Sequence, residues 1–189
     1  KEIGYHPEYW GQKGHYGVAI LSKKKPIEVQ KGFIKDTAED QKRFIQAKFK
    51  WGKKSITIMN GYFPQGENRS HETKFPKKIK YYADLKKHIK KTQKTEDNLI
   101  VMGDFNVAPS PLDIGIGEIN AKRWLKEGKT AFLPEEIDMW NSIKDLGFID
   151  SWREQNPDEG SIFSWFDYRS RMFDDTPKRG LRIDHILIA

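Results

Sequence analysis

The sequence predicts an α/β fold that occupies one domain, residues 1–189. Short apolar runs of strand length alternate with longer stretches that carry apolar residues at helical spacing, which is typical of strands and helices packed in layers. With 189 residues, 37% of them hydrophobic, the chain is long enough to bury a substantial core. It contains no internal repeat and no low-complexity linker, so a single domain is expected.

Several runs have the length and composition of β-strands. Those at 17–21 and 99–102 are apolar throughout, as expected of buried strands. Those at 44–51 and 55–60 are separated by a tight, glycine-containing turn and predict a hairpin. A last run, 181–188, closes the chain as a strand.

Two amphipathic helices are predicted between these strands. The first covers about 75–92, and the second begins near Pro134 and ends at Gly147. The apolar stripe of the first helix consists of Phe75, Ile79, Tyr82, Leu85 and Ile89. Its opposite face carries Lys77, Lys78, Lys86, Lys87, Lys90 and Lys91. We interpret that face as solvated, with DNA contact as the alternative. The stripe of the second helix consists of Ile137, Trp140, Ile143 and Leu146.

The charge balance favours an acidic partner. Lys and Arg number 34 against 27 Asp and Glu, for a net charge of +7, which suits a polyanion such as nucleic acid. The chain has no cysteine, which excludes disulfides, thiolate metal sites and cysteine nucleophiles and is compatible with a cytoplasmic location. No apolar run approaches the ~20 residues that span a bilayer, so no membrane association is expected.

The segment 99–106 carries the first candidate site residues. An apolar strand runs into Gly103, and Asp104 and Asn106 follow at a spacing that places both side chains on one side of an extended chain. Ligands of open α/β sheets bind beyond the carboxyl ends of strands. Asp104 could take a proton from water while Asn106 holds a phosphate oxygen or a metal-bound water. Equally, Asp104 could cap a loop or the next helix.

Three further segments carry polar or aromatic groups in suggestive places. Tyr62 follows a strand and could offer its hydroxyl to a phosphate, or could pack on the core. Asp184 lies inside an apolar strand, where it could orient an imidazole or form a salt bridge with Arg182 or Arg179. The segment 163–179 interleaves aromatic and basic residues, as in a loop that stacks on DNA, although a core strand would also be aromatic.

Both ends of the chain look cut. It starts at Lys1 rather than a methionine, and it stops within the apolar run that ends at Ala189. Natural termini more often fray into polar residues. We therefore expect the sequence to be an internal fragment of a longer protein.

Taken together and in order, these segments resemble the exonuclease III family of the endonuclease/exonuclease/phosphatase superfamily. The resemblance runs from about Tyr9 to the end of the chain. The matching blocks are 11–19 (GQKGHYGVA), 60–66 (NGYFPQG), 102–106 (MGDFN), 112–117 (LDIGIG), 132–136 (FLPEE), 163–170 (FSWFDYRS) and 179–184 (RGLRID).

The resemblance implies a fold and an activity. The fold would be a four-layer α/β sandwich of two packed mixed sheets flanked by helices, incomplete at both ends. The activity would be hydrolysis of phosphodiester bonds in double-stranded DNA with Mg²⁺ or Mn²⁺. Members of the family degrade 3′ ends, cleave beside abasic sites and clear blocked 3′ termini. We expect a monomer.

The resemblance also implies a role for each matching residue. Asp104 would activate the attacking water and Asn106 would stabilise the transition state, both at the metal site. Tyr62 would lie near the scissile phosphate, and Asp184 would orient a catalytic histidine. The expected DNA-binding residues are Gln65, Arg69, Trp165 and Arg169, of which Trp165 would accommodate the abasic sugar.

The chain departs from the family pattern at both ends. The opening Gln-Glu-Thr segment, which carries a metal-binding glutamate, and the closing Ser-Asp-His segment, which carries the catalytic histidine, are absent. His185 cannot replace that histidine, because adjacent residues of a strand point to opposite faces. We expect the parent protein to be active and this chain alone to be inactive. The alternatives are a DNA-binding module without catalysis and a phosphohydrolase of the same superfamily that acts on other substrates.

Overall fold

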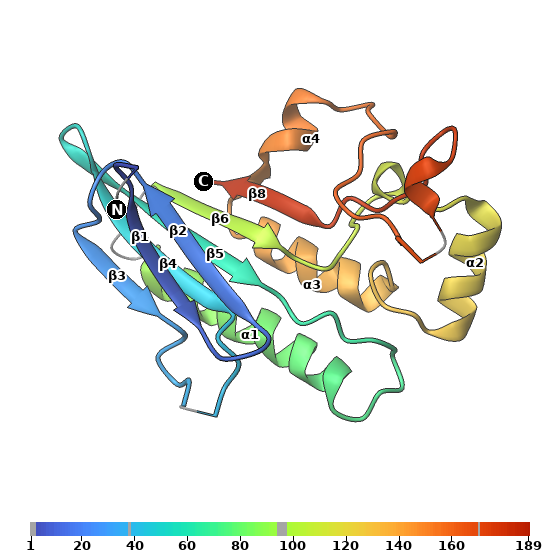
Figure 1. The fold of residues 1–189 in the computed structure, drawn as a ribbon, viewed down its shortest axis with the longest axis horizontal. Helices are drawn as coiled ribbons and strands as arrows, with labels where there is room; N and C mark the ends of the chain where they lie inside the picture. Colours follow the sequence, from blue (N-terminus) through green and yellow to red (C-terminus); the bar gives the residue numbers. More distant parts are fainter. Residues whose placement is uncertain (1–2, 38, 94–97, 170) are drawn as a thin grey trace.

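The computed structural model describes residues 3–37, 39–93, 98–169 and 171–189, which form two β-sheets and a set of helices (Figure 1). The larger sheet has six strands in the order β3-β4-β5-β6-β8-β7 and is mixed; the smaller pairs β1 with β2 antiparallel. The strands are β1 (His6–Gly11), β2 (Gly17–Ser22), β3 (Glu28–Lys31), β4 (Phe44–Trp51), β5 (Lys54–Tyr62), β6 (Leu99–Asp104), β7 (Ile149–Asp150) and β8 (Asp184–Ile188). The helices are α1 (Lys74–Thr92), α2 (Glu118–Glu127), α3 (Pro134–Lys144) and α4 (Ser151–Gln155), with short 3₁₀ turns at Pro111–Asp113 and Met172–Asp174.

The two sheets and the helices form successive layers (Figure 1). The β1–β2 pair packs on one face of the larger sheet over β4 and β5, and α1 and α3 lie side by side on the other face. Successive side chains of β4 point to opposite faces of the larger sheet, so the strand contributes to the core on each face. Phe44 joins the core beneath the helices, whereas Ile45, Ala47 and Phe49 pack towards β1–β2. The predicted α/β fold with two packed sheets and flanking helices is confirmed. The smaller sheet is antiparallel rather than mixed, because its strands are joined by the short connection 12–16.

Most of the predicted elements are present with small shifts at their ends. The hairpin of β4 and β5, strand β6 and the two predicted helices all form. The closing strand starts at Asp184, later than predicted, because Leu181 forms only isolated bridges, to Ile114 and Trp165. The prediction omitted the strands β1, β3 and β7 and the helices α2 and α4.

The buried face of α1 differs from the predicted stripe at one position. Ile79 is 45% exposed, while Lys78 is fully buried, so Lys78 does not belong to the solvated lysine face. The buried positions 75, 78, 82, 85 and 89 alternate three- and four-residue steps, which keeps them on one side of a helix. A lysine, Lys78, therefore occupies a core position on the buried face of α1.

None of the helices in the described ranges is long and apolar enough to cross a membrane.

The register of three neighbouring strands positions the candidate site. Strand β5 runs parallel to β6, with Tyr62 opposite Asp104 and Gly61 opposite Gly103. Strand β8 runs antiparallel to β6 on its other side, with Asp184 opposite Asp104. Gly103 has a φ of +129°, a backbone conformation that favours glycine. A Cβ atom there would lie 2.0 Å from the carbonyl oxygen of Gly61, so β5 and β6 approach closely only because Gly103 has no side chain.

This contact predicts a large effect of Gly103→Ala. Backbone strain and the clash with Gly61 should lower the free energy of unfolding by ~3 kcal/mol or more. The matched control is Gly52→Ala, at a positive φ of 60° with no atom within 4 Å of the added Cβ, which should cost about 1 kcal/mol. Urea unfolding of both variants measures the difference. Equal losses would contradict the close approach at Gly103.

Candidate active site

The four predicted catalytic residues lie together at one end of the larger sheet. Tyr62, Asp104 and Asp184 occupy laterally adjacent positions on β5, β6 and β8. Asn106 follows β6 directly, and its side chain bonds to Asp104. The strand row formed by Tyr62, Asp104 and Asp184 thus joins residues that lie up to 122 positions apart in the sequence.

Asp104 and Asn106 hold each other in a tight local turn. One Asp104 carboxylate oxygen accepts the backbone N–H of Asn106 at 2.8 Å, and the other accepts its amide Nδ2 at 3.0 Å. The same Nδ2 donates to the carbonyl of Phe63 at 2.9 Å. Asn106 has a φ of +52°, a left-handed conformation that asparagine tolerates better than most residues. Asp104 therefore also stabilises the loop, as the alternative interpretation of its sequence position proposed.

The environment of Asp104 suits a base that works near neutral pH. Burial raises the pKa of Asp104 to about 6, and the charge of Asp184 acts in the same direction. The hydrogen bond from the Asn106 N–H and the charges of Lys78 and Arg43 oppose this rise in pKa. A carboxyl with such a pKa is ionised at pH 7 and still basic enough to accept a proton.

An arginine that the sequence did not single out lies against Tyr62. The guanidinium of Arg43 is 4.6 Å from the centre of the Tyr62 ring and 4.0 Å from that of Tyr16. Arg43 also donates to the Tyr62 carbonyl at 3.0 Å. This arrangement fixes Tyr62 through cation–π contacts and a hydrogen bond. No local pattern marks Arg43, because it lies just before β4 and its partners lie in other segments.

Asp184 is exposed, whereas the next residue, His185, is buried, so the predicted alternation of their side chains is confirmed. The alternative salt bridge of Asp184 is wrong. Arg182 instead binds two buried aspartates, and Arg179 pairs with Asp175.

The hydroxyl oxygen of Ser164 accepts the N–H groups of Ile183 and Asp184 at 3.0 and 3.1 Å, which fixes the start of β8 beside the site.

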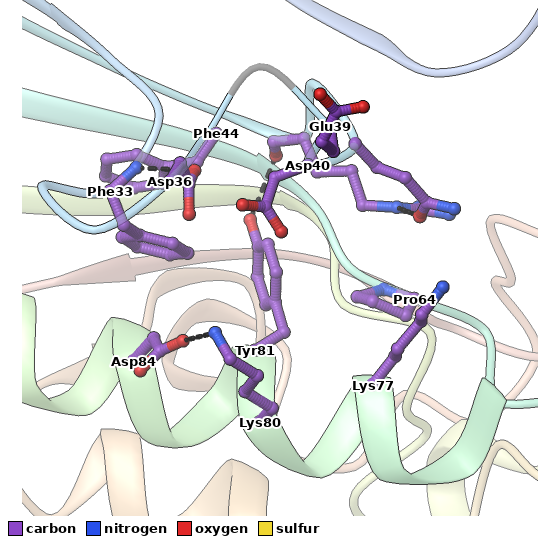
Figure 2. A pocket seen from close by; sticks show the side chains of 12 residues that line it. Phe33, Asp36, Glu39, Asp40, Phe44, Pro64, Lys77, Lys80, Tyr81 and Asp84 are labelled. Carbon is purple, nitrogen blue, oxygen red and sulfur yellow. Dashed lines mark hydrogen bonds and ion pairs between the residues drawn. The ribbon is translucent and has the colours of Figure 1, made fainter. Parts of the chain in front are cut away.

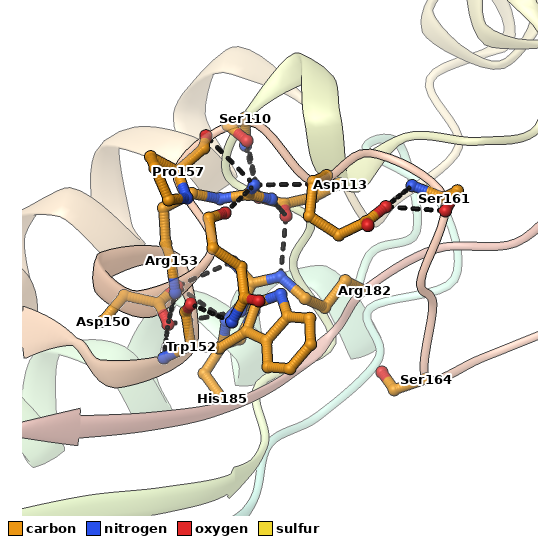
Figure 3. A network of polar contacts seen from close by, with 12 residues as sticks. Ser110, Asp113, Asp150, Trp152, Arg153, Pro157, Ser161, Ser164, Arg182 and His185 are labelled. Carbon is orange, nitrogen blue, oxygen red and sulfur yellow. Dashed lines mark hydrogen bonds and ion pairs between the residues drawn. The ribbon is translucent and has the colours of Figure 1, made fainter.

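A buried polar network lies beneath β8 (Figure 3). Arg182 donates through Nε to Asp113 and through Nη2 to Asp150, each at 2.7 Å, and Arg153 also donates to Asp113 at 2.7 Å. Burial alone would raise the pKa of Asp113, but the bonds from Arg182 lower it below its usual range. The pKa of Asp150 is lowered in the same way, by His185 and Arg182 against its burial. Both carboxylates are therefore ionised and paired.

His185 belongs to this network rather than to the site. Its Nδ1 lies 3.1 Å from Nη1 of Arg182, and its Nε2 lies 2.8 Å from the carbonyl oxygen of Val107. Its Nδ1 also lies 3.5 Å from a carboxylate oxygen of Asp150. The ring thus links β8 to the loop that follows Asn106.

The four predicted DNA-binding residues lie on loops outside the strand row. Gln65 is exposed on the loop that follows β5, and Arg69, on the same loop, forms a bidentate pair with Glu135 at 2.5 and 2.8 Å. Trp165 is half-buried and bridges to Leu181, close in the chain to Asp184. Arg169 is exposed and lies over the ring of Tyr168, with no contact to the four catalytic candidates.

Two cavities flank the site, and they differ in character. One of about 700 Å³ is lined by Gly103, Asp184, Ser164 and Phe163 among others, so it opens beside the strand row. The other, of about 190 Å³, lies between α1 and residues 36 and 39–41 (Figure 2). The smaller cavity is lined by side chains of both charges, the carboxylates of Asp36, Glu39, Asp40 and Asp84 and the cations of Arg43, Lys77 and Lys80.

The oxygen donors of the site fit a hard cation. Asp104 and Asp184 provide carboxylates and Asn106 an amide oxygen, and the described residues contain no cluster of three or more His, Cys, Asp or Glu that could hold a metal by itself. Mg²⁺ is commonly bound by one or two carboxylates together with water and substrate phosphates. A site with few protein ligands is therefore compatible with Mg²⁺ and unsuited to a structural zinc.

The strand row and the paired sheets define a class of protein. The sequence profile of the endonuclease/exonuclease/phosphatase family matches residues 3–189, and the chain belongs to this family. It is 51% identical to exodeoxyribonuclease III of Haemophilus influenzae over 189 residues, which are the whole chain and 70% of that protein. It is also 26% identical to an exodeoxyribonuclease of Bacillus subtilis, covering 98% of the chain and 68% of the relative.

Solved structures show the same likeness. A 3′-5′ exonuclease of Neisseria meningitidis superimposes with a TM-score of 0.87 and 32% identity, over 100% of this chain and 68% of the other. An AP endonuclease of Archaeoglobus fulgidus superimposes with a TM-score of 0.82 and 33% identity, over 99% and 67%. The chain thus spans between two thirds and about 70% of the length of these four relatives.

The raised pKa of Asp104 predicts that Asp104→Asn increases the free energy of unfolding by an amount that depends on pH. The pKa of Asp104 is about 6 in the folded state and 3.8 in the unfolded state, so the protonated carboxyl favours the folded protein. This contribution to stability is complete below pH 3.8 and is lost as the pH rises through about 6. In metal-free buffer the variant should therefore be more stable than wild type at pH 8 by about 1–2 kcal/mol, and by less at pH 4. Asp138→Asn, at an exposed position of α3, is the control. The same difference at both pH values in urea unfolding would contradict the shift.

The buried polar network beneath β8 predicts that Arg182→Met strongly lowers the free energy of unfolding. The variant leaves two buried carboxylates without their main partner, which should cost ~3–5 kcal/mol. Arg171→Met removes an exposed pair with Asp174, in which the arginine side chain is 82% exposed, and should change stability little. Thermal unfolding of both variants tests this. A small loss for Arg182→Met would show that the network does not stabilise β8.

Proposed function

We propose that the protein is a DNA-repair nuclease that hydrolyses phosphodiester bonds in double-stranded DNA. Its substrates would be 3′ ends, which it would shorten, abasic sites, which it would incise, and blocked 3′ termini, which it would clear. The observation that carries this proposal is the strand row of Tyr62, Asp104 and Asp184, with Asn106 bonded to Asp104. The names of the relatives, exodeoxyribonucleases and an AP endonuclease, support the same chemistry.

Each residue of the row has a part in the reaction. Asp104 accepts a proton from the attacking water, for which a pKa of about 6 suits it. The Tyr62 hydroxyl stabilises the charge that develops on the phosphate oxygens, and so does the Asn106 amide once its Nδ2 exchanges its bond to Asp104 or Phe63 for a phosphate oxygen. Asp184 is exposed and free to accept a hydrogen bond from an imidazole, although not that of His185, which faces the other side of the strand.

A divalent cation, Mg²⁺ or Mn²⁺, would be held by oxygen atoms of Asp104 and Asn106. Such an ion supplies positive charge to the phosphate during phosphodiester hydrolysis. Hard oxygen ligands without thiolates favour these ions over zinc.

DNA contact would extend from this centre over the neighbouring loops. Gln65, Arg69 and Arg169 would meet phosphates, and Trp165 would lie against the sugar of an abasic site. Arg69 would have to exchange Glu135 for a phosphate, since its guanidinium forms a bidentate pair in the free protein. The net charge of +7 supports such binding. We further propose that the protein acts as a monomer in the cytoplasm.

The test is incision of a duplex that carries an abasic-site analogue, with the full-length protein that the gene encodes and Mg²⁺. Asp104→Asn should lower kcat by about 10³-fold or more, because it removes the base. Asp138→Asn should cleave like wild type. Unchanged cleavage by Asp104→Asn would refute the assignment of the base. Binding of the duplex without cleavage by wild type would instead favour a DNA-binding module.

A further inference from the structure

In the described part of the chain, a fully buried lysine contacts two loops of the site and a buried glutamate. Lys78, on α1, is fully buried, as is its partner Glu136 on α3. Besides its ion pair with Glu136, the ammonium donates to the carbonyl of Asn106 at 2.9 Å and to that of Gln65 at 3.2 Å. All three N–H bonds of the ammonium are thus used.

The two carbonyl acceptors lie on different loops of the site. Asn106 belongs to the loop that follows β6, and Gln65 to the loop that follows β5. Lys78 therefore ties these two loops to one point in the core. The bond to Asn106 acts on the same residue whose amide contacts Asp104 and whose φ is +52°.

Glu136 extends the connection to a third loop. The oxygen atom of Glu136 that does not face Lys78 accepts the backbone N–H groups of Ala131 and Leu133 at 2.8 and 2.9 Å. The carbonyl of Ala131 in turn accepts the N–H of Ala108 at 2.7 Å, which lies two residues beyond Asn106. The loop after β6 is thus held on both sides, by Lys78 directly and by Glu136 through residue 131.

Stability alone does not account for a pair in this position. A buried ion pair carries a desolvation cost that can exceed its Coulombic gain, and apolar side chains of similar size often serve as well or better. The neighbouring buried positions of α1 are occupied by Phe75, Tyr82 and Leu85, so an apolar residue at position 78 would extend the apolar face of the helix. What an apolar residue cannot supply is three donors aimed at two loops and a carboxylate.

We propose that Lys78 and Glu136 are positioning residues for the nuclease reaction, which hold Asn106 and the loop of Gln65 in the arrangement that the transition state requires. This inference rests on the proposed function. The pair touches no substrate, and it acts by fixing the backbone of a residue that does.

The test uses the double variant Lys78→Met/Glu136→Gln in the full-length protein. It leaves no unpaired charge in the core, and the substituted amide keeps an oxygen for the N–H groups of Ala131 and Leu133. Relative to wild type, kcat on the abasic duplex should fall about 10- to 100-fold with KM within about threefold, since the amide that stabilises the transition state is misplaced. The conservative single variant Lys78→Arg should keep more of the wild-type kcat than the double variant. Lys80→Met, on the exposed side of the same helix, should behave as wild type.

Hydrogen exchange of the metal-free protein gives a second readout that does not depend on activity. The N–H groups of Asn106 and Ala108 should lose at least about tenfold in protection in the double variant, while that of Val101 in β6 keeps its protection. Unchanged protection of both amides, or wild-type kcat in a stably folded double variant, would overturn the proposal. If wild type fails to cleave DNA at all, the proposed function fails, and the exchange of Asn106 and Ala108 still decides whether the pair fixes the loops.

Discussion

The register of β5, β6 and β8 determines where the functional side chains of this protein lie. It places Tyr62 and Asp184 on either side of Asp104, and it is possible only because Gly103 lets the backbone of Gly61 approach without a side chain between them. In a sheet, a slip of one residue turns every side chain to the opposite face. Such a slip of β8 would exchange Asp184 for His185 beside Asp104 and remove the second carboxylate from the site.

Buried charges on both sides of this strand row hold the loops and the strand that carry the site. On the side of α1 and α3, Lys78 and Glu136 connect three loops. Beneath β8, Arg182 and His185 connect Asp113, Asp150 and the carbonyl of Val107. Lys78 uses all three of its N–H donors, and Arg182 donates to two carboxylates, so each of these buried charges is paired, which is the condition under which a buried charge is tolerated. The site itself is different, since Asp104 is partly buried without a direct cationic partner and its pKa rises accordingly.

Much of this arrangement could be predicted from local sequence. The apolar run into Gly103 marks β6. The two-residue spacing of Asp104 and Asn106 predicts their proximity, but the extended chain expected between them is wrong, because β6 ends at Asp104 and Asn106 has a φ of +52°. The alternation of Asp184 and His185 follows from strand geometry. Lys78 could not be assigned in this way, because a lysine on an amphipathic helix is normally solvated and its partner Glu136 lies 58 residues away. Arg43, which contacts Tyr16 and Tyr62, and Arg182, whose partner Asp113 lies 69 residues away, depend equally on tertiary packing.

These side chains should form one centre for a phosphodiester in duplex DNA. The decisive experiment is a crystal structure of the full-length protein with a nicked duplex, solved without metal to prevent turnover. We expect a phosphate at the nick to lie within hydrogen-bonding distance of the Asn106 amide and the Tyr62 hydroxyl, with Asp104 facing it. A duplex bound at another surface, with that strand row open to solvent, would contradict this assignment.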